Sequence, residues 1–426
     1  MLPLPDMFRL KQIFPRPVVA DIAETTRNEL SKLRLNHKIR KGQKIGLTVG
    51  SRNIENLLPL LQTIVDAIKA LGGEPYLIAA MGSHGGGTEI GQKDILDHLN
   101  ITENTLAAKV LTCADCEVVT HTTGGLPVFI VTSALAMDGI IVVNRVKSHT
   151  SFTGIVESGL IKMLAVGLGG PKGAQQFHGF GQEALPRLLV EMGDAILENL
   201  PILGGLAIVE NAYEETAMIK GIATENMIVE EEETLRYAKS LAPSLPVDNI
   251  DLLIIQEMGK DFSGTGMDTH IIGRARIHNV QEPEKPCIQR IAALDLSQKS
   301  QGNATGVGLA DFITKKLLDK IDREATYLNC LTSTFVMRAA IPMTFETEEE
   351  LLNAALYSLS GIAPGRLRIV MIANTLSLTD CLISKAILPE LAGKPNMIID
   401  KKPLEFLFDS QGALLTRIPN GDFIQK

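Results

Sequence analysis

The stretch NRVKSHTSFTGIVESGLIKMLAVGLGGPKGAQQFH, residues 144–178, holds the densest set of candidate functional residues in the chain. Two histidines, His149 and His178, lie on either side of Lys162, which is embedded in the apolar run GLIKMLAV. A lysine in such surroundings loses hydration, and this favours a neutral, nucleophilic amine that can be modified covalently. The alternative is a lysine that snorkels from the end of an amphipathic helix. The glycine-rich segment GLGGPKG follows at once.

Polar residues also follow the apolar segments that we interpret as buried strands. Ser51 and Arg52 come directly after the strand IGLTV, and His84 lies in GSHGGGTE after the strand PYLIAAMG. His149 follows the uninterrupted apolar run IIVVN by five residues. In parallel sheets, ligands gather beyond the carboxyl ends of the strands. We therefore expect Arg52, His84 and His149 to be on neighbouring strand-end loops, where a site would form.

The order of strands and helices predicts the fold class. Leu57, Leu61, Ile64, Ile68 and Leu71 recur at spacings of three and four between two apolar strands, as expected for an amphipathic helix. This strand–helix–strand order implies a parallel sheet with helical crossovers. A Pro/Ser-containing segment at 240–248 precedes a second series of the same kind. We predict an α/β protein with two domains, residues 1–245 and 246–426, each with a largely parallel sheet flanked by helices.

Composition restricts the functional classes. The chain has 426 residues, 45% of them hydrophobic, and a net charge of −8, which argues against binding to nucleic acid or to an anionic membrane. No segment resembles a signal peptide or a membrane span, so we expect a cytoplasmic protein. Five cysteines fit reduced thiols, and Cys113 and Cys116 are interpreted as buried thiols rather than a metal or redox pair. The acidic run at 230–233 is interpreted as a solvated helix face.

The order of these motifs resembles the nickel-dependent lactate racemase family, whose members and homologues are 2-hydroxyacid racemases and epimerases. The family motif has a histidine, a glycine-containing run that ends in lysine, and a second histidine; here these are His149, Lys162 and His178. SRN at 51–53 and GSHGGGTE at 82–89 match two upstream family motifs. The sequence departs from the family where Val49 replaces an aspartate, and where Glu257 replaces a glutamine three residues before Lys260.

The resemblance implies a cofactor and a reaction. The cofactor is a nickel pincer nucleotide (pyridinium-3,5-bisthiocarboxylic acid mononucleotide), attached to Lys162 and supplied by maturation proteins, with His178 as the protein ligand of nickel. His84 and His149 are the acid/base pair that moves the hydroxyl proton of a 2-hydroxy acid while the cofactor takes and returns the C2 hydride. The active site is expected in the cleft between the two domains.

The resemblance also assigns residues that bind the cofactor and the substrate. Ser51, Arg52 and Lys172 are assigned to the cofactor, and Arg52, Lys260 and Glu257 to the substrate. A guanidinium also suits a carboxylate on physical grounds, since its planar fork matches two oxygens.

Two other classes of function remain open on the residues alone. His84, His149 and His178 are also plausible zinc ligands in a hydrolase or lyase. Alternatively, the protein is not an enzyme, and its glycine-rich loops bind a phosphate or carboxylate. One such loop is GKDFSGTGMD at 259–268, which contains Lys260.

Overall fold

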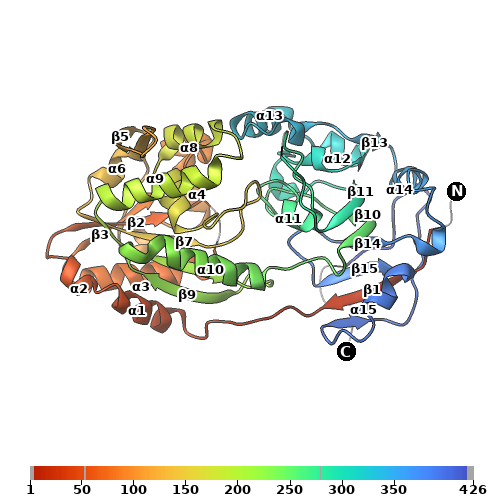
Figure 1. The fold of residues 1–426 in the computed structure, drawn as a ribbon, viewed down its shortest axis with the longest axis horizontal. Coiled ribbons are helices and arrows are strands. Elements are labelled where there is room, and N and C mark those ends of the chain that lie inside the picture. The colour runs from red at the N-terminus through yellow and green to blue at the C-terminus, as the bar shows by residue number, and fades with distance from the viewer. Residues whose placement is uncertain (1–3, 52–53, 279, 420–426) are drawn as a thin grey trace. The chain divides into compact units, whose positions relative to one another are not determined.

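A computed structural model describes residues 4–51, 54–278 and 280–419, and its chain divides into two compact α/β units (Figure 1). The N-terminal unit comprises residues 15–242. The C-terminal unit comprises residues 243–426 together with residues 1–14. Each unit contains one large, mostly parallel sheet with helices packed against it, as the alternation of strands and helices predicted.

The sheet of the N-terminal unit has six strands in the order β4-β3-β2-β7-β8-β9. Neighbouring strands are parallel except for the antiparallel pair β8 and β9. The strands are β2 (Lys44–Val49), β3 (Glu74–Ala79), β4 (Lys109–Leu111), β7 (Gly139–Arg145), β8 (Ile202–Glu210) and β9 (Thr216–Ile222). The strand order reverses between β2 and β7, because β3 and β4 extend the sheet on one side and β8 on the other. Open α/β sheets bind ligands outside such a reversal.

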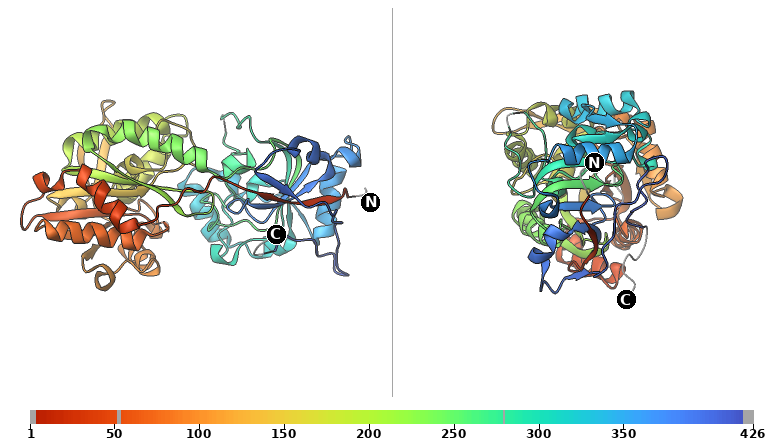
Figure 2. Two further views of the ribbon diagram at one scale, coloured as in Figure 1. Left: turned by 90° about the horizontal axis from the view of Figure 1, so that it is seen from below. Right: turned by 90° about the vertical axis from the view of Figure 1, so that its right-hand side faces the viewer.

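Both faces of this sheet are covered. Alternate residues of β7 enter two different cores: Ile140 and Val142 pack with one group of helices, and Ile141 and Val143 with another. Figures 1 and 2 show α1 and α3 on one side of the sheet and α9 on the other. A strand buried on both faces is apolar at successive positions, which explains the uninterrupted run IIVV.

The helices of the N-terminal unit vary greatly in length. The longer ones are α1 (Ile22–Lys32), α3 (Leu57–Ala70), α4 (Glu89–His98), α8 (Gly170–Gly179), α9 (Leu185–Asn199) and α10 (Met227–Leu241). The short ones are α2 (Leu35–Lys38), α5 (Glu103–Leu106), α6 (Thr132–Leu135), α7 (Leu160–Lys162) and the 3₁₀ turns Gly85–Gly87 and Thr224–Asn226. A π-helical turn covers Met163–Gly167, and a separate hairpin is formed by β5 (Cys116–His121) and β6 (Pro127–Val131).

The sheet of the C-terminal unit has eight strands in the order β13-β12-β11-β10-β14-β15-β1-β16. The first five strands, β13 to β14 in this order, are parallel to one another. The pairs β14–β15, β15–β1 and β1–β16 are antiparallel. The strands are β1 (Met7–Gln12), β10 (Asn249–Ile255), β11 (Cys287–Ala293), β12 (Phe312–Thr314), β13 (Met343–Phe345), β14 (Ile369–Ile372), β15 (Asp380–Ser384) and β16 (Met397–Ile399).

None of the described α-helices of the C-terminal unit is longer than 10 residues. They are α11 (Thr269–Ile272), α12 (Lys315–Asp319), α13 (Arg323–Thr332), α14 (Glu348–Tyr357) and α15 (Leu388–Leu391). Single 3₁₀ turns cover Gln298–Ser300, Val307–Leu309, Val336–Ala339, Pro364–Arg366 and Lys385–Ile387. In the described part of the chain, no helix is both long enough and apolar enough to span a membrane.

The N-terminal strand differs from the domain division drawn from the sequence, which placed residues 1–245 together. Strand β1 pairs with β15 and β16, nearly four hundred residues later, so residues 1–14 belong to the C-terminal unit. Its side chains Met7 and Leu10 are fully buried in that unit's two cores. The pairing partner of a lone strand cannot be inferred from the strand's own sequence, because any edge of either sheet accepts its backbone. The boundary after Ala242 lies within the linker inferred at 240–248.

Candidate functional site

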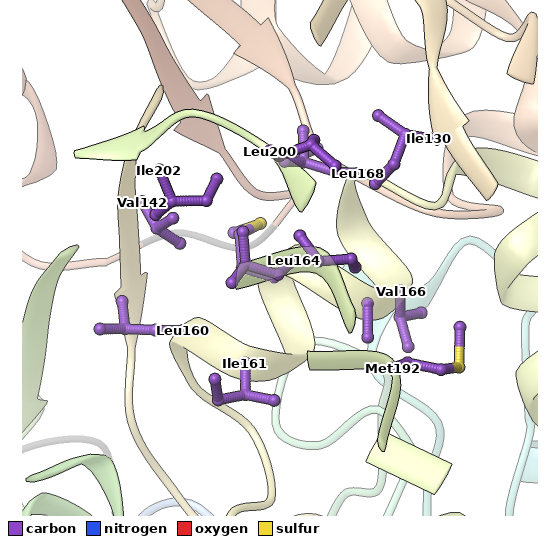
Figure 3. Packing of buried hydrophobic residues seen from close by; sticks show 14 of the residues in the cluster. Ile130, Val142, Leu160, Ile161, Leu164, Val166, Leu168, Met192, Leu200 and Ile202 are labelled. Atoms are coloured by element: carbon purple, nitrogen blue, oxygen red, sulfur yellow. The ribbon is translucent and has the colours of Figure 1, made fainter. Parts of the chain in front are cut away.

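Lys162 stands where a short helix turns into a π-helix. Helix α7 ends at Lys162 and the π turn Met163–Gly167 follows without a break. The apolar neighbours of the lysine are buried. Figure 3 shows them packed among side chains that include Val142 and Ile202 from the sheet and Met192 from α9; the neighbours labelled there are Leu160, Ile161, Leu164 and Val166. Lys162 itself is half-buried. π turns occur often at functional sites, because the extra residue displaces a side chain from the regular helical register.

His178, in the last turn of α8, lies close enough to Lys162 for the lysine charge to affect its titration. Burial, and then the positive charge of Lys162, lower the pKa of His178 from 6.5 to about 4. The imidazole is therefore neutral at neutral pH. A neutral imidazole is the form that binds a transition metal. The pair thus places an unprotonated imidazole within reach of the charge of a lysine amine.

A continuous series of aromatic rings connects His178 with His149. The His149 ring stacks on Phe152 with 4.2 Å between centroids, Phe152 meets Phe177 edge-on at 6.2 Å, and Phe177 meets His178 at 5.4 Å. Phe177 is fully buried and Phe152 nearly so. Two histidines that are 29 positions apart in sequence thus belong to one packed cluster.

The loop that carries His149 is closed by backbone bonds and has a buried acid at its centre. Lys147 and Ser158 exchange both backbone hydrogen bonds, at 2.7 and 3.1 Å. Within the loop, the carboxylate of Glu157 accepts the backbone N–H of His149 at 2.7 Å and that of Gly154 at 3.2 Å. Glu157 is 0% exposed, and its Oε1 also accepts from Lys239 Nζ at 2.7 Å.

The same loop sets the tautomer of His149. Its Nδ1 accepts the backbone N–H of Ser151 at 3.1 Å, and the residue is only 8% exposed. An Nδ1 that accepts a hydrogen bond carries no proton, so the neutral ring has its proton on Nε2. His149 therefore presents an N–H donor in this conformation.

His84 and Ser51 are brought together from the loops after β3 and β2. Ser51 Oγ contacts His84 Nδ1. Both loops approach the π turn: the N–H of Gly82 donates to the carbonyl of Gly167 at 3.1 Å, and a Cβ on Gly50 would lie 3.2 Å from the terminal methyl group of Met163. The loops after β2 and β3 therefore both reach the segment that follows Lys162.

The glycine-rich segment after Lys162 packs closely against the β5–β6 hairpin. Gly170 has φ +61°, and a Cβ there would lie 2.6 Å from Cys116 Sγ. Burial raises the pKa of the Cys116 thiol, and the Cys113 Sγ lies 3.1 Å from Thr132 Oγ1. The two cysteines are thus buried packing residues. Lys172 lies exposed in the first turn of α8.

Three further site residues were inferred from the sequence. Arg52 lies outside the described residues. Lys260 and Glu257 belong to the C-terminal unit and follow β10 there. The Lys260 amine donates to the carbonyl of Gly264 at 2.7 Å and to Asn329 Oδ1 at 2.5 Å. Burial, with Asp295 and Asp261 nearby, raises the pKa of Glu257.

One acidic residue was misinterpreted from the sequence. Glu231 lies in the run 230–233 that was taken as a solvated helix face, yet it is 0% exposed. Its Oε2 accepts the backbone N–H of Ile161 at 2.8 Å, in the turn that leads to Lys162. The helical period could have revealed this, because Glu231 falls in register with the buried Met227, Leu235 and Ala238.

A preformed zinc centre, the alternative raised by the three histidines, has no counterpart among the described residues. No group of three or more His, Cys, Asp or Glu side chains in residues 4–51, 54–278 and 280–419 is arranged to hold a metal ion. His84, His149 and His178 therefore do not form a ligand triad in this conformation.

Comparison with solved structures identifies the fold. The lactate racemase apoprotein from Thermoanaerobacterium thermosaccharolyticum aligns with 86% of this chain and 94% of its own, with a TM-score of 0.50 and 12% identity. The fold is lactate racemase-like. A Thermotoga maritima protein aligns with 77% of this chain and 84% of its own, with a TM-score of 0.51 and 13% identity. No protein-family model and no curated protein sequence matches the chain.

Proposed function

We propose that this protein is a 2-hydroxyacid racemase or epimerase that works with a nickel pincer nucleotide attached to Lys162. The observation that carries the proposal is the pairing of Lys162 with His178. Burial, and then the positive charge of Lys162, keep the His178 imidazole neutral, with its pKa near 4. An amine for covalent attachment and an unprotonated nitrogen for nickel are what such a group requires. The lactate racemase-like fold supports the same assignment.

Other residues of the N-terminal unit would hold the remainder of the cofactor. The resemblance assigns Lys172, Ser51 and Arg52 to the cofactor; Arg52 lies outside the described residues. Such cationic and hydroxyl groups suit a nucleotide phosphate. When bound, the cofactor would supply hydride-transfer chemistry at C2 of the substrate. The protein supplies orientation and proton transfer.

The two histidines have different hydrogen-bond partners at Nδ1, and this affects which tautomer each adopts. His84 Nδ1 contacts the Ser51 hydroxyl. In the tautomer whose Nδ1–H donates to that oxygen, the Nε2 lone pair of His84 can take the substrate's hydroxyl proton. His149 starts as an Nε2–H donor, because Ser151 occupies its Nδ1. Before His149 can act as a base at Nε2, its proton must move to Nδ1 and the Ser151 contact must break. In these tautomers His84 can act as a base at Nε2 directly, whereas His149 can do so only after this rearrangement.

Racemisation of 2-hydroxy acids tests the proposal. The protein is produced together with pincer-nucleotide maturation proteins, incubated with single enantiomers of several 2-hydroxy acids, and the products are separated by chiral chromatography. The wild-type protein should convert each enantiomer of its substrate to a mixture, and Lys162→Ala should not. Absence of racemisation and of bound nickel in the wild-type protein would overturn the proposal.

A further inference from the structure

Helix α10 has an acid on its buried face. Met227, Leu235, Ala238 and Leu241 are buried, as expected for the core-facing side of an amphipathic helix. Glu231 lies on the same side and is fully buried. A carboxyl group is expensive to bury unless its oxygens find donors. The contacts of Glu231 therefore indicate what this residue does.

Glu231 bonds to the backbone that leads into Lys162. Its Oε2 accepts from the N–H of Ile161 at 2.8 Å, and the N–H of Leu160 also lowers its pKa. A Cβ on Gly159 would lie 2.2 Å from Oε1. The φ of Gly159 is −169°, an extended value open to any residue, so it is the approach of Glu231 that requires glycine here.

The opposite end of α10 reaches the His149 loop. Lys239 Nζ lies 2.7 Å from Oε1 of the fully buried Glu157. Glu157 in turn accepts the backbone N–H of His149. Removing the lysine leaves a buried carboxylate without its counter-charge, which is strongly unfavourable.

We infer that α10 positions two residues of the candidate site: Glu231 fixes the turn that carries Lys162, and Lys239, through Glu157, fixes the loop that carries His149. That Lys162 and His149 are functional residues rests on the proposed function. The contacts that Glu231 and Lys239 make do not depend on it. Both act through backbone, so they are positioning residues rather than catalytic ones. Burial raises the pKa of Glu231 to about 7, and Glu231→Gln is the neutral variant that keeps an oxygen for the Ile161 N–H.

The first test measures the freedom of Lys162 in the apoprotein. Wild type and variants are treated briefly with an acetylating N-hydroxysuccinimide ester, and modification of Lys162 relative to Lys172 is measured by peptide mass spectrometry. Glu231→Ala and Glu231→Asp remove the acceptor from the Ile161 N–H, so Lys162 should react about fivefold faster, as expected for loss of one hydrogen bond. Glu231→Gln keeps an acceptor and should react as wild type.

Glu233→Ala is the matched control, because Glu233 is on the solvent side of α10, where its carboxylate lies near Lys220. It should leave Lys162 unchanged. Equal labelling of Lys162 in wild type, Glu231→Ala and Glu231→Asp would overturn the inference, as would a Glu231→Gln protein that behaves like Glu231→Ala. If Glu231→Ala fails to fold, Glu231→Asp and Glu231→Gln still decide the question.

The second test concerns the His149 loop. Hydrogen exchange in the segment 147–158 should be about tenfold faster in Lys239→Met than in wild type, and unchanged in Lys220→Met, whose lysine pairs with Glu230 on the solvent side of α10. Unchanged exchange in Lys239→Met would overturn this half of the inference. Neither test needs cofactor, so a wild type that never binds nickel refutes the proposed function and leaves these results standing.

Discussion

The titration of His178 in the apoprotein follows directly from its environment. Its pKa should lie near 4 rather than 6.5, because burial disfavours the imidazolium first and the charge of Lys162 second. Lys162→Met removes the second cause only. The pKa should then rise, but stay below 6.5.

The lowered pKa of His178 makes the stability of the protein depend on pH. Between pH 4 and 6.5 the unfolded chain binds a proton at His178 that the folded chain does not, so the free energy of unfolding rises with pH in this window. The contribution is fully present above pH 6.5 and is lost as the pH falls to 4. A pKa shift of this size changes the free energy of unfolding by about 3 kcal/mol across the window. His178→Gln should abolish this part of the pH dependence.

Two measurements on the apoprotein test this prediction. Two-dimensional NMR of the histidine rings, with His178 assigned from the His178→Gln spectrum, gives the pKa. Urea unfolding from pH 4 to 7 gives the difference in unfolding free energy between wild type and variant. A His178 ring that titrates near 6.5, or a difference that does not change with pH, would refute the description of His178 as a buried neutral imidazole beside a charged lysine.

Two further predictions concern the loops around Lys162. In single-turnover experiments with 2-deuterated substrate, His84→Ala and His149→Ala should transfer deuterium to the cofactor from opposite enantiomers, each losing roughly 10²–10⁴-fold with the other; identical preferences would contradict the two-base assignment. Gly170→Ala should lower the free energy of unfolding by about 1–3 kcal/mol in urea titrations, because its Cβ meets Cys116 Sγ at a positive φ. Cys116→Ala in the same chain should recover only part of that loss, since the strained φ remains.

The fold class and much of the site followed from local sequence patterns. A strand buried on both faces, such as β7, is visible as an unbroken apolar run, and its carboxyl end then marks where His149 must emerge. His149, Lys162 and His178 also lie within one short stretch, so their proximity needed little long-range information.

What the sequence did not predict depended on contacts between distant segments. Strand β1 joins the C-terminal unit through pairing with β15, for which its own residues carry no signal. Glu231 was grouped with its acidic neighbours by composition, although its helical position faces the core. The tautomer of His149 depends on a backbone N–H of Ser151, which no side-chain motif encodes.

The most direct test of the central claim is the site of the covalent adduct. Protein produced with the maturation proteins is digested and mapped by mass spectrometry, in the wild type and in Lys162→Ala and Lys172→Ala. We predict the pincer-nucleotide mass on the peptide that contains Lys162, its retention in Lys172→Ala and its loss in Lys162→Ala. An adduct that survives Lys162→Ala and disappears with Lys172→Ala, or a wild-type protein without any adduct, would contradict the assignment of Lys162.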